Sequence, residues 1–271
     1  LEHDLRGAVE RGETFLVYQP QIELATSRII GMEVLMRWRH ATRGLISPAR
    51  FIPVAEDSGI ILTLGEWALR ESCRQAQLWR DQGLLDVCVS VNVSAVQLRQ
   101  TDFVHIVAQV LADTGLPPAN LELELTESVI MQETESTLEK LRELETLGVK
   151  VAIDDFGTGH SSLSYLRQFT VDRLKIDQSF VHDLPGNEDA EAIAGAIVAM
   201  GLRLGLRIIA EGVETEAQAA FLQSALCREG QGYFYARPMT ADAFQAWVAT
   251  WKQAQPIPDP AGEPESRSPE S

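Results

Sequence analysis

Residues 148–159 read GVKVAIDDFGTG. Gly148 stands where a helix is expected to stop, Val149–Ile153 is a short run rich in β-branched residues, and Asp154-Asp155 follows the end of that run. The stretch predicts a helix that passes into a buried strand, with two carboxylates at the carboxyl end of the strand.

The same unit recurs on both sides of this stretch. Short β-branched or leucine-rich runs alternate with longer runs of helical periodicity, and they lie at Val87–Val93, Leu121–Thr126, Arg173–Ile176 and Leu206–Ala210. Helix punctuation agrees, with Ser47-Pro48 at an expected helix start and Gly83 and Gly115 at expected helix ends. Strands that alternate with helices in this way favour a parallel sheet.

The beginning of the chain differs. Phe15–Ile22 and Arg28–Trp38 are joined by a short polar turn, which predicts an antiparallel hairpin. The expected fold class is therefore α/β, a TIM-like (β/α)8 barrel with an irregular, antiparallel first strand. An open doubly wound sheet is the competing topology, but it usually carries a glycine-rich phosphate loop after its first strand, and none is present.

Composition limits the function. The chain has 271 residues and a formal net charge of -16, which disfavours binding to a nucleic-acid polymer. Three scattered cysteines without CxxC spacing predict reduced thiols in a cytoplasmic protein, and no segment is long and apolar enough to contact a membrane as a spanning helix. The first residue is Leu1, which suggests a piece of a longer protein. We expect one domain over residues 1–252 and a disordered proline-rich, acidic tail over 253–271.

Polar side chains gather at the ends of the predicted strands. In a βα-barrel these ends meet at one mouth, where active sites are built. So many carboxylates cannot all stay ionised together without protons or cations. Because every donor is an oxygen, hard divalent cations such as Mg²⁺ or Mn²⁺ are favoured, and two of them suit in-line phosphoryl displacement. The residues concerned are Glu33, Asn92, Glu124, Glu127, Asp154, Asp155, Lys175, Asp177, Glu211, Glu214 and Gln231.

These motifs resemble the EAL-type phosphodiesterase domain, which acts on the bacterial second messenger cyclic di-GMP. The likeness covers about Phe15 to Pro238. It rests on an ordered set of motifs: YQP at Tyr18–Pro20, EVLMRW at Glu33–Trp38, FIPVAE at Phe51–Glu56, SVNVS at Ser90–Ser94, ELTES at Glu124–Ser128, DDFGTG at Asp154–Gly159, LKIDQSF at Leu174–Phe180, AEGVE at Ala210–Glu214 and QGYFYARP at Gln231–Pro238.

The resemblance implies roles for these residues. It implies a first metal site of Glu33, Asn92, Glu124 and Asp154, and a second of Asp154, Asp155 and Glu211. Catalytic roles fall on Lys175, on Glu211 as ligand, general base or both, and on Glu127 as support of the DDFGTG loop. The implied substrate-binding residues are Gln19, Leu35, Arg37, Asp177, Glu214, Gln231, Phe234 and Pro238, with Phe234 and Tyr235 favoured to face a guanine.

Two departures from the family pattern remove no metal-binding group: Val34 follows the signature glutamate in place of alanine, and His160 stands where tyrosine is common. The resemblance implies hydrolysis of cyclic di-GMP to 5'-pGpG with two Mg²⁺ or Mn²⁺ ions, Ca²⁺ being expected to inhibit. It also implies a homodimer and upstream sensor or GGDEF-type domains in the full-length protein. The alternatives are a catalytically weak cyclic di-GMP receptor and, from another class, a barrel lyase that uses Lys175 as a Schiff base.

Overall fold

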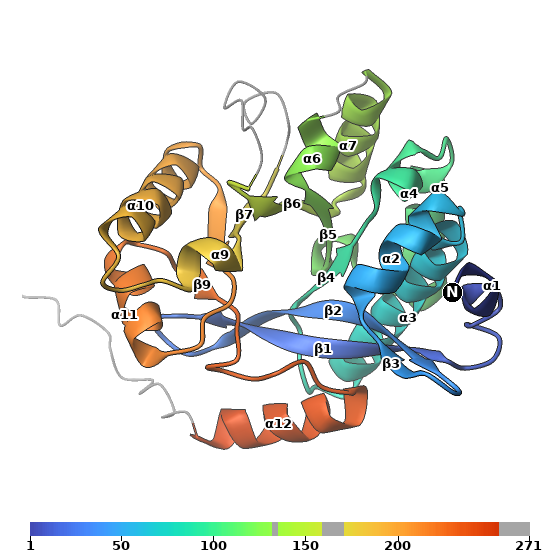
Figure 1. Cartoon of the computed structure of the whole chain (residues 1–271), viewed down its shortest axis with the longest axis horizontal. Helices are drawn as coiled ribbons and strands as arrows, with labels where there is room; N and C mark the ends of the chain where they lie inside the picture. The colour runs from blue at the N-terminus through green and yellow to red at the C-terminus, as the bar shows by residue number, and fades with distance from the viewer. Residues whose placement is uncertain (132–134, 159–170, 255–271) are drawn as a thin grey trace, which may run out of the picture.

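The computed structural model describes residues 1–131, 135–158 and 171–254. Its strands form one sheet that closes on itself, in the order β1-β2-β4-β5-β6-β7-β8-β9 and back to β1. Figure 1 shows the strands around a central space with the helices outside them. The strands are β1 (Thr14–Glu23), β2 (Ile29–His40), β3 (Gly44–Ile46), β4 (Cys88–Asn92), β5 (Leu121–Thr126), β6 (Lys150–Phe156), β7 (Arg173–Ile176), β8 (Arg207–Ala210) and β9 (Glu229–Gly230).

The hairpin at the start of the chain closes the barrel. β1 runs antiparallel to β2, with Gln19 opposite Glu33, and antiparallel to β9, with Ile22 opposite Gly230. The strands β2, β4, β5, β6, β7, β8 and β9 pair in parallel, each with the next in this order. The predicted barrel with an antiparallel first strand is thus confirmed, and the open doubly wound sheet is wrong. β3, which was not predicted, extends β2 outside the closed ring.

The helices surround the strands. They are α1 (Glu2–Leu5), α2 (Pro48–Asp57), α3 (Ile61–Asp81), α4 (Ala95–Arg99), α5 (Phe103–Thr114), α6 (Glu127–Met131), α7 (Glu135–Leu147), α9 (Gln178–Val181), α10 (Glu188–Arg203), α11 (Glu216–Ser224) and α12 (Ala241–Ala254), with a short 3-10 helix η1 (Pro118–Asn120). Helix punctuation follows the prediction in part. Gly115 ends α5 in the left-handed conformation, whereas Ser47 precedes α2 without a side-chain capping bond.

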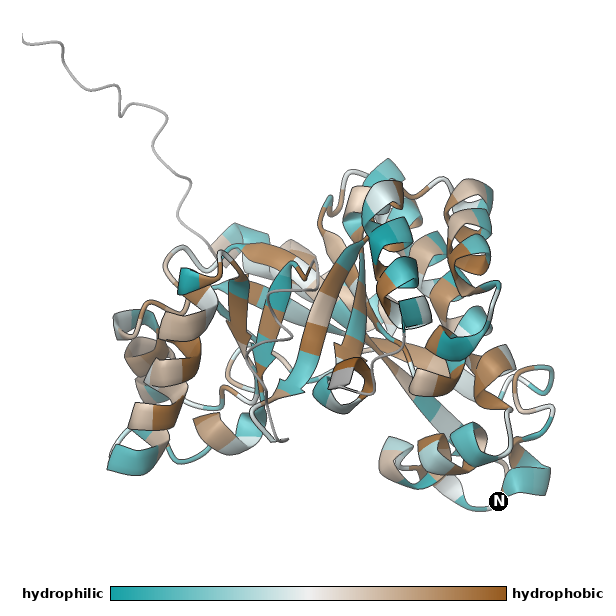
Figure 2. Ribbon diagram, turned by 90° about the horizontal axis from the view of Figure 1, so that it is seen from above, coloured by the Kyte–Doolittle hydropathy of each residue, from teal (hydrophilic) through white to brown (hydrophobic). Residues whose placement is uncertain are grey.

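The apolar core lies between the strands and the helices, not inside the barrel. Strand residues that face outward, such as Val89, Val91, Leu123 and Ile153, are buried in it. Successive side chains of a strand point to opposite faces, so the residues between them face the barrel interior. Figure 2 shows helices that are hydrophobic on part of their surface and hydrophilic elsewhere, as packing on one side requires.

An aromatic cluster anchors the C-terminal helix across the outside of the hairpin. The rings of Tyr18 on β1 and Trp79 on α3 meet edge to face with their centroids 4.9 Å apart, and Phe244 on α12 lies 5.1 Å from Trp79. All three residues are almost completely buried. This packing holds α12 against β1, so the chain after β9 covers the seam where the barrel closes. The predicted tail lies outside the described residues from position 255 onward.

Helix α10 packs against β7 and β8 and buries Ala194, Ile197, Val198 and Gly201. In the described part of the chain, every helix is too short or too polar to cross a lipid bilayer.

Two glycines of α10 provide a matched test of this packing. A Cβ at Gly195 would meet nothing within 4 Å, whereas a Cβ at Gly201 would lie 2.1 Å from Cδ1 of the buried Ile208. We expect Gly195→Ala to raise the free energy of unfolding by about 0.5–1 kcal/mol, because alanine favours the helix. Gly201→Ala should lower it by about 1–3 kcal/mol through overpacking. Urea denaturation measures both changes, and equal effects of the two substitutions would contradict this packing.

Candidate active site

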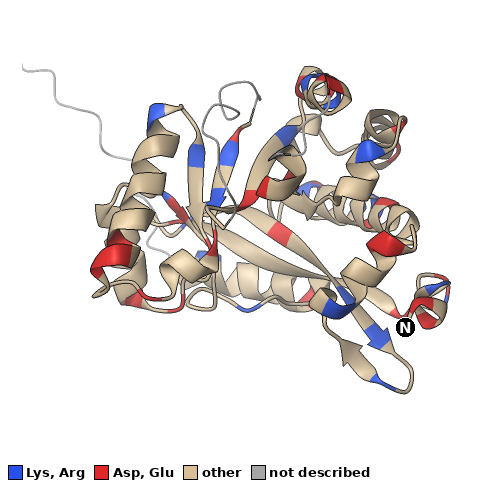
Figure 3. Ribbon diagram, turned by 45° about the horizontal axis from the view of Figure 1, so that its top comes forward, with Lys and Arg blue, Asp and Glu red and all other residues tan. Residues whose placement is uncertain are grey.

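Lys175 occupies the centre of the barrel mouth. Its Nζ lies 2.7 Å from Glu124 Oε2, 3.0 Å from Asp154 Oδ1 and 2.7 Å from Glu211 Oε1. Glu33 Oε2 on β2 lies 3.7 Å away. These side chains come from four strands and from the residue after a fifth, so barrel closure alone brings them together. Figure 3 shows acidic segments on the strands around the central space as well as on the outer helices.

Amide side chains complete this group on the side of the hairpin. Asn92 Nδ2 at the end of β4 donates to Glu33 Oε1 at 2.9 Å. Gln231 Nε2 donates to the other oxygen of Glu33 and, at 3.1 Å, to Gln19 Oε1. Gln19 in turn donates to the carbonyl of Ala236 at 3.0 Å. Both oxygens of Glu33 are therefore oriented before any ligand binds.

The carboxyl end of β6 carries the paired aspartates. Asp154 Oδ1 accepts from the backbone N–H of Asp155 at 3.0 Å, and Asp155 adopts a left-handed conformation with φ 54°. Glu127 Oε2, from the start of α6, accepts from the N–H of Gly157 at 3.0 Å. Asp177 caps α9 by accepting from the N–H of Ser179 at 3.0 Å. His160 lies outside the described residues.

Burial shifts the pKa values of this cluster. Burial raises the pKa of Glu211 to about 8, against the opposing effect of Lys175, and burial with the charge of Asp154 raises the pKa of Asp155 to about 6. Burial also raises the pKa of Glu124 well above its usual value. For Lys175 burial acts to lower the pKa, but the carboxylates led by Glu124 outweigh it and the net shift is upward. The lysine is therefore held protonated.

The donor set fits divalent cations. Oxygens of Asp154, Asp155 and Glu211 all lie within 4.8 Å of one another. Glu124 Oε1 is buried without a hydrogen-bond partner, which leaves a lone pair for a cation. With every group ionised, the carboxylates of Glu33, Glu124, Asp154, Asp155 and Glu211 and the ammonium of Lys175 would carry a formal charge of about −4, which two divalent cations would neutralise. Oxygen-only donors are those that Mg²⁺ and Mn²⁺ prefer.

Two cavities open beside the cluster and share Glu33, Leu35, Arg37 and Asp154 in their walls. One, of about 310 Å³, is also lined by Gln19, Glu211, Glu214, Gln231 and Pro238. The other, of about 390 Å³, extends between β2, β4, α2 and α3, where apolar side chains such as Ile52 and Ile61 line it. Most of the predicted substrate-binding residues thus border one of two adjoining cavities.

The aromatic residues after β9 are placed differently from the expectation. Tyr233 lines the 310 Å³ cavity, and Arg237 Cζ lies 4.2 Å from its ring centroid. Phe234 is 43% exposed and packs edge to face on Tyr235, whose ring also contacts Trp251. The three consecutive rings therefore have different surroundings. The sequence motif QGY contains Tyr233, but nothing in the motif indicates which of the three aromatic residues lines the cavity.

Sequence reasoning also missed a second polar layer beneath the first. Arg173, Glu122 and Glu229 are buried inside the barrel and form ion pairs. Their signal was a charged residue at every second position of short apolar runs, as in LELEL at 121–125 and RLK at 173–175.

Comparison of the sequence with known proteins finds one family model and several relatives that match most of the chain. The family model described as "EAL domain" matches residues 2–238. The chain is 46% identical over 249 residues to the bifunctional diguanylate cyclase/cyclic di-GMP phosphodiesterase MucR of Pseudomonas aeruginosa, covering 92% of this chain and 36% of MucR. It is 41% identical over 252 residues to the cyclic di-GMP phosphodiesterase NbdA of the same organism, covering 93% of this chain and 32% of NbdA. The chain thus spans about a third of each of these relatives.

Solved structures show the same likeness. The cyclic di-GMP complex of the PaMucR phosphodiesterase superimposes with a TM-score of 0.86 and 45% identity, over 89% of this chain and 98% of that chain. The EAL enzyme Bd1971, in a form bound to cAMP and cyclic di-GMP, gives a TM-score of 0.87 at 31% identity, over 91% of this chain and 68% of that chain. The closed barrel, the oxygen-rich mouth and these matches lead to one conclusion: this chain belongs to the EAL domain family.

Proposed function

We propose that this domain is a phosphodiesterase that hydrolyses cyclic di-GMP to linear 5'-pGpG with two bound Mg²⁺ or Mn²⁺ ions. One observation carries the proposal: Glu33, Glu124, Asp154 and Glu211 converge on Lys175 beside the two cavities. The names of MucR and NbdA support the substrate, as does the complex of PaMucR with cyclic di-GMP. Two adjoining cavities that meet at Leu35 and Arg37 suit the two nucleotide halves of this ligand.

The residues would share the chemistry as follows. Glu33, Asn92, Glu124 and Asp154 would hold the first cation, and Asp154, Asp155 and Glu211 the second. The cations would supply the positive charge that activates water and stabilises the attacking and leaving oxygens of an in-line displacement.

Other side chains would bind substrate and move the proton. Arg37 is half-buried in the wall of both cavities, where its planar fork would clamp a phosphate. Lys175, held protonated, would keep the carboxylates in place and attract the phosphate. Glu211 contacts Lys175 and lines the 310 Å³ cavity, where its carboxylate would act as a ligand of the second cation, as a general base or as both. Gln19, Glu214, Gln231 and Pro238 would shape the pocket around the nucleotide.

The competing functions make different demands. A Schiff-base lyase needs a lysine that loses its proton readily, and the upward pKa shift of Lys175 opposes this. A binding-only receptor needs no complete ligand set, whereas each expected ligand position is filled here.

The buried free thiols of Cys73, Cys88 and Cys227 support a cytoplasmic location. The greater length of MucR and NbdA supports upstream signalling domains; the homodimer is proposed from the family resemblance, and sedimentation velocity tests it.

Removing Glu33 tests the metal assignment. We expect wild-type protein with Mg²⁺ to convert cyclic di-GMP to pGpG, measured by chromatography. Substituting a residue that only supports a metal ligand typically reduces activity by about 10–100-fold. Glu33→Ala should reduce it further, because it removes a proposed ligand itself. Glu143→Ala, at an exposed position of α7, is the control and should keep full activity. Substrate that stays bound but intact with wild-type protein would favour the receptor function, and an active Glu33→Ala variant would reject the ligand role.

The choice of cation provides a second prediction. Ca²⁺ is larger than Mg²⁺ and accepts looser coordination, so it should bind at the carboxylates without aligning the reacting atoms. We expect calorimetry to detect Ca²⁺ binding and the pGpG assay to detect no turnover with it. Equal rates with Ca²⁺ and Mg²⁺ would contradict the argument.

Glu127 provides a third prediction, because it binds the N–H of Gly157, directly after the strand that carries the paired aspartates. Glu127→Ala removes this acceptor, and we expect it to reduce kcat by about 10–100-fold, the usual cost of losing an outer-shell partner. Glu127→Gln keeps an acceptor oxygen of the same reach and should retain most of the activity. Similar losses in both variants would mean that the charge of Glu127, not its bond to the loop, is what matters.

A further inference from the structure

A second polar layer lies one step below the proposed metal ligands. Residues two positions apart on a strand face the same side. Each mouth residue on six strands therefore has a partner below it that also faces the interior. From the lower to the upper layer these pairs are Gln21 and Gln19 on β1, Gly31 and Glu33 on β2, Ser90 and Asn92 on β4, Glu122 and Glu124 on β5, Arg173 and Lys175 on β7, and Glu229 and Gln231 on and after β9.

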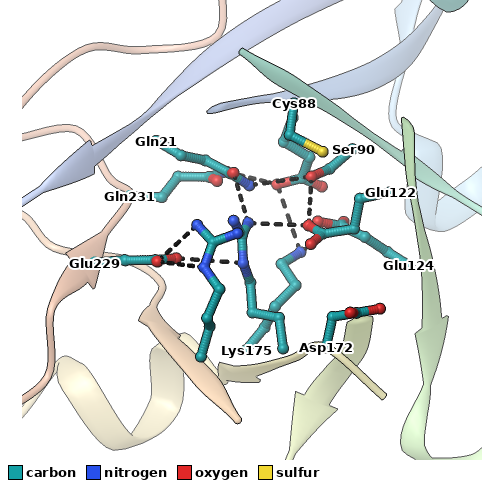
Figure 4. Close-up of polar contacts among 12 residues, drawn as sticks. Gln21, Cys88, Ser90, Glu122, Glu124, Asp172, Lys175, Glu229 and Gln231 are labelled. Atoms are coloured by element: carbon teal, nitrogen blue, oxygen red, sulfur yellow. Dashed lines mark hydrogen bonds and ion pairs between the residues drawn. The ribbon is translucent and has the colours of Figure 1, made fainter. Parts of the chain in front are cut away.

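Arg173 connects this lower layer. Its side chain is fully buried, and its Nη1 lies 2.9 Å from Glu122 Oε1 and 2.8 Å from Gln21 Oε1. Its Nε lies 3.2 Å from Glu229 Oε2. Ser90 Oγ donates to Glu122 Oε1 at 2.8 Å. Figure 4 shows Gln21, Ser90, Glu122 and Glu229 turned toward one another, close to Lys175 and Glu124 of the upper layer.

Stability does not explain such a layer. Burying charges costs desolvation free energy, and well-packed apolar side chains often replace buried ion pairs without loss. The interior of a βα-barrel is usually filled by bulky branched residues. Arg173 and Arg207 here balance Glu122 and Glu229, since Arg207 Nη2 lies 2.7 Å from Glu229 Oε1. The lower layer therefore adds no net charge to the mouth; what it adds is fixed geometry.

Two cross-links join the same pair of strands, β5 and β7, which are not neighbours in the sheet. The lower one is Arg173–Glu122, and the upper one is Lys175–Glu124. Cations that bind Glu124, Asp154 and Glu211 would compete with the ammonium group of Lys175 for the same carboxylate groups. The lower cross-link is sealed from solvent and does not take part in that competition.

We propose that Arg173 and Glu122 are positioning residues that hold β5 and β7 at the spacing the metal ligands need while the contacts of Lys175 rearrange. The proposal rests on the proposed function for its cations, but not on turnover. Ser90 and Arg173 both donate to Oε1 of Glu122. An acceptor oxygen at this position therefore matters more for the positioning role than the negative charge.

Two substitutions at one position separate these effects. Glu122→Met and Glu122→Gln both remove the negative charge of Glu122, and in each variant Arg173 keeps its ion pair with Glu229. Only Glu122→Gln keeps an oxygen acceptor for Arg173. We expect Glu122→Met to raise the dissociation constant for Mn²⁺, measured by calorimetry, by about 10–100-fold, and Glu122→Gln to stay within about threefold of wild type.

A destabilised variant remote from the site controls for loss of stability. Gly201→Ala should bind Mn²⁺ like wild type although it unfolds more easily. If Glu122→Met does not fold, Arg173→Lys takes its place with the same expectation, because lysine keeps the charge but loses the fork that reaches Glu122 and Gln21 together.

The outcomes keep the two proposals apart. Wild-type affinity in Glu122→Met, or equal losses in Glu122→Met and Glu122→Gln, would overturn the positioning role and leave the phosphodiesterase untouched. Wild-type protein that binds Mn²⁺ but leaves cyclic di-GMP intact would overturn the phosphodiesterase, and the split between the two Glu122 variants would still decide the positioning role.

Discussion

The ammonium group of Lys175, buried at the mouth of the barrel, holds the site together. Four carboxylates lie within 3.7 Å of its Nζ, and none of them is near another in sequence. Burial raises the pKa values of Glu124 and Glu211 even beside this ammonium group, and without its positive charge they would rise further. The lysine therefore preserves an arrangement of oxygens that is suited to cations before any cation arrives.

Closure of the barrel depends on the antiparallel hairpin. β1 lies between β2 and β9 and pairs with both, so the seam of the barrel passes directly beside Glu33. Gln231 bridges this seam by donating to both Glu33 and Gln19. The outer face of β1 is covered by α12 through Tyr18, Trp79 and Phe244. Aromatic packing on the outer face of β1 and hydrogen bonds on its inner face thus both stabilise the part of the barrel where β1 lies between β2 and β9.

Alternation along the strands explains how a stable core and a charged interior coexist. Leu121, Leu123 and Leu125 of β5 pack outward against the helices, while Glu122 and Glu124 point inward. The apolar core keeps the fold stable, so the interior is available for polar groups. Those groups form two layers, a neutral lower one whose Arg173–Glu122 pair is sealed from solvent and a strongly acidic upper one open to the cavities.

The sequence by itself determined the succession of strands and helices, the antiparallel start and the residues at each strand end, because local periodicity and glycine punctuation are properties of neighbouring residues. β5 and β7 match their predicted ranges, and β4, β6 and β8 differ only at their ends. Only the tertiary structure decided which of three consecutive aromatic residues lines the cavity and that Arg173 pairs with Glu122. Those outcomes depend on turn geometry and on distances between strands separated by dozens of residues, which no local pattern encodes.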